Sequence, residues 1–113
     1  MLSLSRPRGN LYDMDEFILF MHDDAVDTAI ATDGNLWAQY MTSLRASGRF
    51  DGGSSIGTGT VFRKGGADAA APTVISGYVR VRAESADAAR AFLVGNPVYE
   101  AGGTVEIREL PRS

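Results

Sequence analysis

The chain is 113 residues long, carries a formal net charge of −3 and contains no cysteine. A chain of this length forms one domain with a modest core and leaves no room for a second domain. The lack of cysteine excludes a disulfide framework, a thiol nucleophile and zinc sites with thiolate ligands. The acidic balance and the single lysine, Lys64, argue against a nucleic-acid partner, because phosphate contacts require clustered Lys and Arg.

The N-terminal segment of the chain and its hydropathy predict a cytoplasmic protein. The longest apolar run, Phe17–Met21, is far shorter than the roughly 20 residues of a membrane-spanning helix, so we expect no contact with a membrane. The basic segment 5–9 has no apolar segment behind it and does not resemble an export signal. We expect residues 1–13 to form a poorly ordered extension and residues 14–113 to form the single domain.

The run Phe17–Met21 predicts a central β-strand that is apolar on both faces. Phe17, Leu19 and Met21 point to one face, and Ile18 and Phe20 point to the other. The helices of so small a domain cover one face of a sheet. A second surface must therefore cover the other face.

Residues 23–33 read as a polar loop with one helical turn at Ala25–Ile30. Asp33 or Asn35 can then cap a helix that ends at Gly48. The helix has an apolar stripe at helical spacing, made of Leu36, Trp37, Tyr40, Met41 and Leu44.

Strands follow this helix. Phe50–Ile56 contains paired glycines, which predict a bulge or a close approach of the backbone. Thr60–Arg63 predicts a short edge strand that turns at Gly65-Gly66 into a hairpin loop. Val74–Arg82 alternates between apolar and polar residues and predicts another strand.

The last third predicts a helix and a final strand. Ser85 caps a helix with Asp87 in its first turn, and Gly95-Asn96-Pro97 ends it. The buried stripe of this helix is Ala89, Phe92 and Leu93. Thr104–Leu110 is the final strand, with Val105 and Ile107 inward and Glu106 and Arg108 outward.

The order of these elements predicts an α+β fold. A βαββαβ chain with short helical crossovers is typical of the ferredoxin-like fold, a four-stranded antiparallel sheet with two helices on one face. The hairpin that begins at Thr60 would add an extra strand to these four. The open face would carry Tyr78, Arg80, Arg82, Glu106 and Arg108, a mixture that suits a partly buried interface or cavity.

Several segments resemble the YCII-related (DGPF-domain) family. They are Tyr40-Met41 with Gly48 and Gly53, Ser76-Gly77-Tyr78, Ser85–Ala89, Asn96-Pro97, and above all Gly102-Gly103-Thr104-Val105-Glu106-Ile107-Arg108. The resemblance covers roughly residues 15–110. It implies a dimeric α+β barrel, in which two ferredoxin-like sheets face each other, and hence a homodimer.

Two features depart from that family. The Asp-Gly-Pro-Phe motif should precede Ser76, whereas the region 69–74 reads Ala-Ala-Ala-Pro-Thr-Val. Enzymatic relatives resembling muconolactone-type or dehydrochlorinase members carry a helix histidine paired with an aspartate. The matching helix position here is Trp37, so that pair does not carry over.

His22 is the only histidine, and it directly follows the first strand. Histidine titrates near neutral pH, and Asp23, Asp24 or Asp51 could orient it for proton transfer. We select His22 and Asp24 as candidate catalytic residues. The alternative, and the more frequent case, is a histidine that hydrogen-bonds a loop carbonyl.

Candidate ligand-binding residues are aromatic or basic. The aromatic side chains could line a small-molecule pocket and the arginines could bind an anionic group, whereas the more frequent roles are core packing and cross-strand ion pairs. These candidates are Trp37, Tyr40, Tyr78, Arg80 and Arg108.

One histidine without cysteine is too sparse for a usual metal site, so we predict no metal ion. The glycine spacing in 52–59 resembles a Walker motif, but Thr58 stands where the phosphate-binding lysine is needed. We predict no cofactor.

Two functional hypotheses remain. In the first, a homodimeric barrel binds a small metabolite in a cavity near His22, with weak acid–base or lyase-like chemistry. In the second, the chain is a non-catalytic dimeric binding or accessory module. His22 facing a pocket within reach of an aspartate would favour the first hypothesis.

Overall fold

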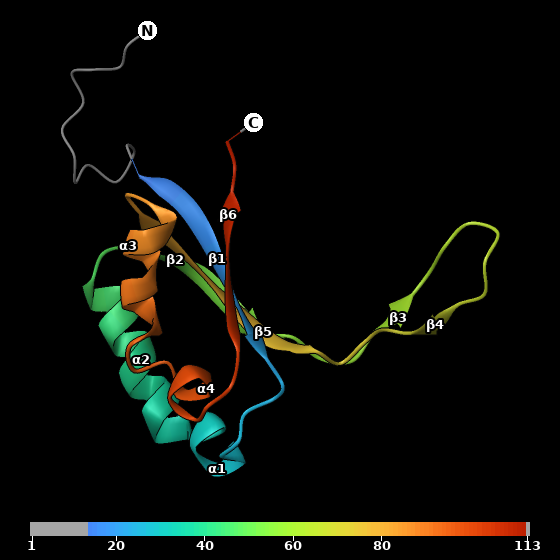
Figure 1. Cartoon of the computed structure of the whole chain (residues 1–113), viewed down its shortest axis with the longest axis horizontal. Helices are drawn as coiled ribbons and strands as arrows, with labels where there is room; N and C mark the ends of the chain where they lie inside the picture. Colours follow the sequence, from blue (N-terminus) through green and yellow to red (C-terminus); the bar gives the residue numbers. More distant parts are fainter. Residues whose placement is uncertain (1–13, 113) are drawn as a thin grey trace, which may run out of the picture.

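The computed structural model describes residues 14–112. Its main sheet has four antiparallel strands in the order β2–β5–β1–β6, and helices cover one face of it (Figure 1). The predicted ferredoxin-like α+β fold is confirmed. The predicted extension at residues 1–13 lies outside the described residues. The strands are β1 (Asp15–His22), β2 (Phe50–Ser55), β5 (Ile75–Ala83) and β6 (Val105–Leu110).

The core lies between β1 and the helices, as the alternation of β1 predicts. Phe17, Leu19 and Met21 are buried, whereas Ile18 and Phe20 on the opposite face are only half-buried. Neighbouring strands and helices supply the other buried members of this cluster, which are Tyr40, Leu44, Val79, Val81, Ala83, Ala89 and Val98. We call the opposite side of the main sheet, which no helix among residues 14–112 covers, the uncovered face.

The first helical region consists of α1 (Thr28–Ala31) and α2 (Gly34–Ala46). Of the two predicted caps, Asp33 caps α2: its side chain accepts hydrogen bonds from the backbone N–H groups of Asn35 and Leu36. Gly48, at φ +73°, follows the helix end in the left-handed conformation that glycine adopts without strain. No helix within residues 14–112 is long and apolar enough to cross a membrane.

The second helical region differs from the prediction of one helix. It consists of α3 (Ala86–Ala89), a 3₁₀ turn over Arg90–Leu93, and a separate helix α4 (Pro97–Glu100). The Asn96 side chain accepts hydrogen bonds from the N–H groups of Val98 and Tyr99. Asn96 and Pro97 therefore begin a new helix rather than only ending the previous one, which agrees with the preference for proline in a first helical turn.

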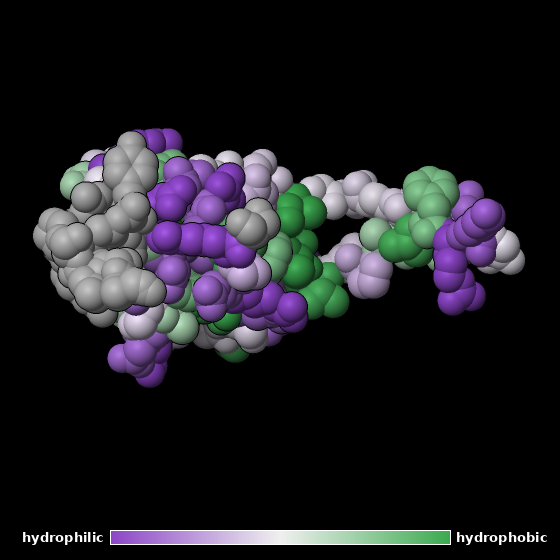
Figure 2. Space-filling model, turned by 90° about the horizontal axis from the view of Figure 1, so that it is seen from above, coloured by the Kyte–Doolittle hydropathy of each residue, from purple (hydrophilic) through white to green (hydrophobic). Residues whose placement is uncertain are grey.

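The connection between β2 and β5 projects from the body. Thr60–Val61 (β3) pairs with Ala69–Ala70 (β4) in a two-stranded sheet of its own, so the predicted strand near Thr60 pairs outside the main sheet. We call residues 56–74 the arm. It stands clear of the body on the side away from the helices (Figures 1 and 2).

Candidate functional site

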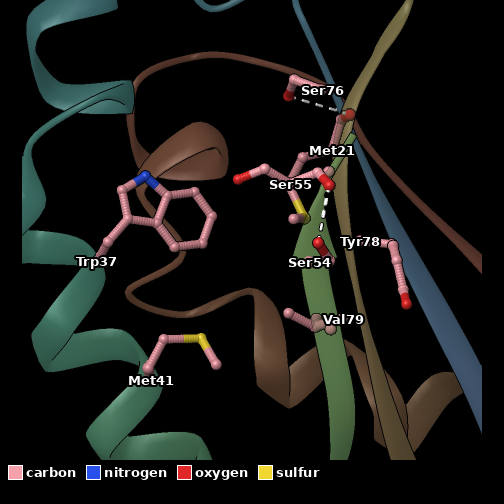
Figure 3. Close-up of a pocket in the computed structure, with 10 residues that line it drawn as sticks. Met21, Trp37, Met41, Ser54, Ser55, Ser76, Tyr78 and Val79 are labelled. Carbon is pink, nitrogen blue, oxygen red and sulfur yellow. Dashed lines mark hydrogen bonds between the residues drawn. The ribbon is translucent and has the colours of Figure 1, made fainter. Parts of the chain in front are cut away.

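A pocket of about 320 Å³ lies between α2 and the sheet, and we call it the helix–sheet pocket. Trp37 and Met41 on α2 face β2 and β5 across it (Figure 3). Its other lining residues are Met21, Gly53, Ser54, Ser55, Ser76, Gly77, Tyr78 and Val79. None of these ten residues is charged, so the pocket suits an uncharged molecule.

Trp37 is held in a fixed orientation at the pocket wall. Its indole N–H donates a 2.7 Å hydrogen bond to the carbonyl of Ala31, at the end of α1. Its ring meets the Tyr40 ring edge to face, with centroids 5.8 Å apart. A fixed aromatic surface loses little conformational freedom when a planar ligand stacks on it.

Glycines on the facing strands let the backbone form the opposite wall. A Cβ atom added at Gly53 would lie 2.5 Å from the Tyr78 carbonyl oxygen and 3.1 Å from the Val79 Cα atom. Because Gly53 and Gly77 have no side chains, their peptide groups lie at the pocket surface. The hydroxyl groups of Ser55 and Ser76 add polar partners at its rim.

The predicted ligand-binding aromatics have three different positions. Trp37 lines the helix–sheet pocket with its ring. Tyr78 contributes to the same wall, although its side chain points away from Trp37 (Figure 3). Tyr40 is buried in the core, where its hydroxyl donates a 2.7 Å hydrogen bond to the Phe92 carbonyl and burial raises its pKa.

The predicted arginines lie on the uncovered face, on the other side of the sheet from this pocket. Arg80 on β5 forms an ion pair with Glu16 on β1. Arg82 pairs with Asp51 on β2, with 3.0 Å between the charged groups. The structure thus supports the cross-strand pairing interpretation for these residues, and Arg80 is not brought together with Trp37.

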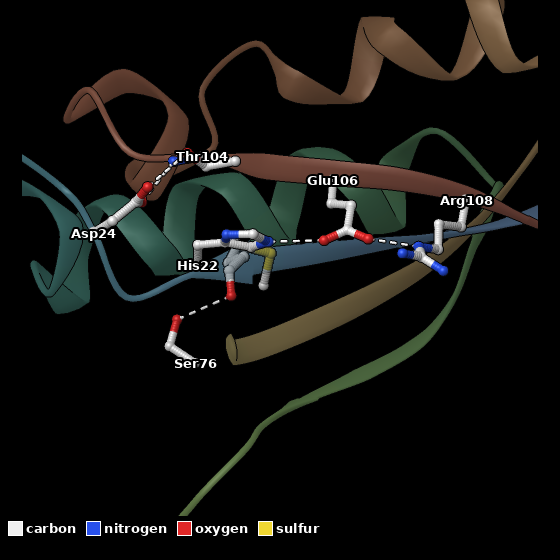
Figure 4. Close-up of polar contacts among 7 residues, drawn as sticks. His22, Asp24, Ser76, Thr104, Glu106 and Arg108 are labelled. Atoms are coloured by element: carbon white, nitrogen blue, oxygen red, sulfur yellow. Dashed lines mark hydrogen bonds and ion pairs between the residues drawn. The ribbon is translucent and has the colours of Figure 1, made fainter. Parts of the chain in front are cut away.

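His22 also lies on the uncovered face, and its side-chain partner is Glu106. Their Nε2 and Oε1 atoms are 2.8 Å apart, and the other Glu106 oxygen accepts a 2.5 Å hydrogen bond from Arg108 Nε (Figure 4). Phe20 pairs directly with Glu106 in the β1–β6 ladder, so His22 is the diagonal neighbour of Glu106. Because a carboxylate only accepts hydrogen bonds, His22 Nε2 is the donor.

Asp24 forms hydrogen bonds with Thr104 rather than with His22. Its carboxylate accepts hydrogen bonds from the Thr104 backbone N–H at 2.8 Å and from the Thr104 hydroxyl at 2.6 Å (Figure 4). These two bonds hold the pKa of Asp24 below its ordinary value. Asp24 thereby ties the loop after β1 to the start of β6. A catalytic role for His22 and Asp24 stays a prediction.

The contacts of Glu106 predict a loss of stability in acid. Hydrogen bonds from His22 first, and from Arg108 second, hold the pKa of Glu106 below its ordinary value of 4.5. When folding lowers the pKa of a carboxyl group, the ionised group stabilises the fold. This stabilisation is complete above the pKa of the group in the unfolded chain, and it is lost as the pH falls through the pKa of the group in the folded chain. We expect Glu106→Gln to be less stable than the wild type near neutral pH, and the difference to shrink progressively below pH 4.5.

Urea unfolding at several pH values measures this difference. Glu109→Gln, an exposed carboxylate on the same strand, is the control for removing one charge from β6. A stability difference between Glu106→Gln and the wild type that stayed constant down to about pH 3 would contradict the expected coupling.

No group of three or more His, Asp or Glu side chains in residues 14–112 is arranged to hold a metal ion. His22 forms a hydrogen bond with one carboxylate, that of Glu106, and a usual metal site needs three or more protein ligands.

No protein-family model and no curated protein matches this chain. Among solved structures, the chain is similar to the 5-chloro-2-hydroxyhydroquinone dehydrochlorinase of Burkholderia phenoliruptrix, solved in complex with 2,5-dihydroxybenzoquinone. The TM-score is 0.55 at 15% sequence identity, over 87% of this chain and 95% of that chain. This likeness shows a shared ferredoxin-like α+β fold, as the resemblance to YCII-related proteins implies. Membership of that family stays a prediction.

Several residues of these sites were not singled out from the sequence. Glu106 was placed on the open face but not beside His22, because the register of β1 with β6 is not readable from alternation alone. Met21, Met41 and Ser55 read as ordinary strand or helix residues. For the backbone part of the pocket wall, the paired glycines at Gly52-Gly53 were a sequence signal, since such a pair indicates a bulge or a close backbone approach.

Proposed function

We propose that this chain is a homodimeric binding protein for a small, planar, uncharged molecule that occupies the helix–sheet pocket. The observation that carries the proposal is the fixed Trp37 ring, which faces a backbone wall across about 320 Å³ without a charged lining residue. An apolar body would contact Trp37, Met21 and Met41. Hydroxyl or carbonyl groups on the ligand would reach Ser55 and Ser76.

Fluorescence of Trp37 tests this binding, because it is the only tryptophan in the chain. Hydroquinone, which is planar and neutral at pH 7, is a suitable probe and should quench the fluorescence in a saturable way. Benzoate, which is planar but charged, is the comparison ligand. Saturable quenching by benzoate but not by hydroquinone would contradict an uncharged ligand.

Ser55 offers a matched pair of variants for the same titration. Ser55 pairs with Gly77 in the β2–β5 ladder and lines the pocket. Ser55→Leu should fill the pocket and weaken hydroquinone binding about tenfold or more, since overpacking costs about 1–3 kcal/mol and 1.4 kcal/mol is a factor of about ten. Ser55→Ala keeps the space and should stay within about threefold of the wild type. Equal binding by both variants would place the ligand elsewhere.

The homodimer part of the proposal rests on the uncovered face. Ile18 and Phe20 lie there half-buried beside cross-strand ion pairs, and a second copy of the sheet would cover them. The mass in solution tests this directly. A strictly monomeric mass of 12.0 kDa at all concentrations would contradict it.

Acid–base chemistry at His22 is the second candidate function. The hydrogen bond between His22 and Glu106 supports it, since Glu106 fixes the ring orientation. Against it, His22 does not line the helix–sheet pocket, and its partner is not an aspartate.

Chloride release from 5-chloro-2-hydroxyhydroquinone, the substrate named for the structural neighbour, separates the two candidates. The binding proposal expects no release above the uncatalysed rate. Release by the wild type that is lost in His22→Gln, in a variant that still folds, would favour chemistry.

A further inference from the structure

The arm has little in its own chain to stabilise it. Two residue pairs join its strands, Thr60 with Ala70 and Val61 with Ala69. A two-stranded hairpin alone is at best marginally stable in water, and stable hairpins pack against further strands or a helix. Within the described part of the chain, β3 and β4 pair only with each other and not with the main sheet. Another surface is therefore needed to hold the arm.

Apolar side chains mark the part of the arm that this surface would cover. Phe62 at the tip is 74% exposed, and Val61 beside it is 44% exposed. Ile56 and Val74 at the root are 41% and 53% exposed. Figure 2 shows apolar atoms on the projecting arm, away from the body. Clustered apolar exposure on a projecting element indicates a contact site.

The position of the arm indicates which surface this is. The helices lie on one side of the main sheet, and the arm projects to the other side, beyond the uncovered face (Figure 1). A second copy packed on the uncovered face would therefore lie next to the arm. We propose that the arm extends along the body of the partner subunit and contacts it through Phe62 and Val61. This inference rests on the proposed homodimer.

Charge agrees with a second copy as the partner. The arm carries two basic residues, Arg63 and Lys64, and one acidic residue, Asp68. The remainder of the chain is thus more acidic than the total net charge of −3. In a twofold dimer each arm would contact a body whose net charge is opposite to that of the arm, and the same contact would occur twice.

The exposure of Phe62 makes a clean test possible. In a single chain Phe62→Ser removes a side chain that is mostly in water, so it should leave the fold of the monomer unchanged. If Phe62 is buried against the partner, the variant should raise the dissociation constant of the dimer about tenfold or more for each of the two arms. Val94→Ser, at a 76% exposed residue that follows the 3₁₀ turn in the helical layer, is the matched control.

Sedimentation velocity over a dilution series measures both variants against the wild type. A dimer that Phe62→Ser weakens and Val94→Ser does not weaken supports the arm contact. If the wild type is a dimer and neither variant changes its dissociation constant, the arm contact is overturned but the homodimer is not. A wild type that is monomeric at all concentrations overturns the homodimer and the arm contact together.

A second measurement reports the contact itself. Because the chain has no cysteine, Lys64→Cys accepts a single nitroxide label at the arm tip. The labelled chain is mixed with a ¹⁵N-labelled wild-type chain that has no nitroxide. Broadened amide resonances in the body of the ¹⁵N chain are then expected, and they arise only across the dimer. Mixed dimers without such broadening would overturn the proposal.

Discussion

Phe17→Ala is expected to lower the free energy of unfolding by about 3–5 kcal/mol, the range for removing a buried aromatic ring. Phe17 is 2% exposed, and β5 and β6 flank its strand on either side. Because β1 pairs with a strand on each side, it cannot shift freely toward the helices to close the space that the ring leaves. Urea unfolding monitored by circular dichroism measures the change.

Phe20→Ala is the matched control, on the same strand but on the uncovered face. In the homodimer that we propose, Phe20 contacts the partner subunit, so the effect of Phe20→Ala should depend on protein concentration. The effect of Phe17→Ala should be present at every concentration. A loss below about 1 kcal/mol for Phe17→Ala would contradict its place in the core.

Gly53→Ala is expected to destabilise the chain by about 1–3 kcal/mol and to reduce hydroquinone binding. The added methyl group would lie 2.5 Å from the Tyr78 carbonyl oxygen, which is closer than a Cβ atom approaches in real proteins. Backbone atoms of β5 would have to move, so the pairing of β2 with β5 and the pocket wall would change together.

Gly57→Ala separates this clash from the general effect of replacing a glycine. A Cβ atom at Gly57 would meet no atom within 4 Å. Gly57→Ala should therefore leave the urea midpoint and the hydroquinone titration unchanged, or stabilise the chain slightly. Equal losses in the two variants would show that the close approach at Gly53 does not determine the effect.

Periodicity made most of the fold predictable. β1 alternates between buried and half-buried residues as expected, and the α2 stripe buries Tyr40 and Leu44. The start of α4 was missed because Asn96-Pro97 serves equally as the end of one helix and the start of the next. Only the hydrogen bonds to the Asn96 side chain decide between the two.

The candidate site was less predictable, for a physical reason. Alternation assigns His22 and Glu106 to the uncovered face, but only the register of β1 with β6 makes them neighbours. Sequence proximity favoured Asp24 as the partner of His22, whereas the loop turns Asp24 toward Thr104. A pocket wall made of peptide groups cannot be recognised from the residue types in the sequence. The glycines that let the backbone reach the pocket are the exception.

The position of β1 in the sheet has a consequence for the chain during synthesis. β1 is the first strand of the main sheet in chain order, yet both of its neighbours, β5 and β6, are the last two strands of that sheet. His22 and its partner Glu106 are 84 residues apart. During synthesis the most apolar strand therefore waits with two unpaired edges until β5 and β6 have been made. Unpaired strand edges and exposed apolar surface promote aggregation, so we expect the nascent protein to be most prone to it in this interval.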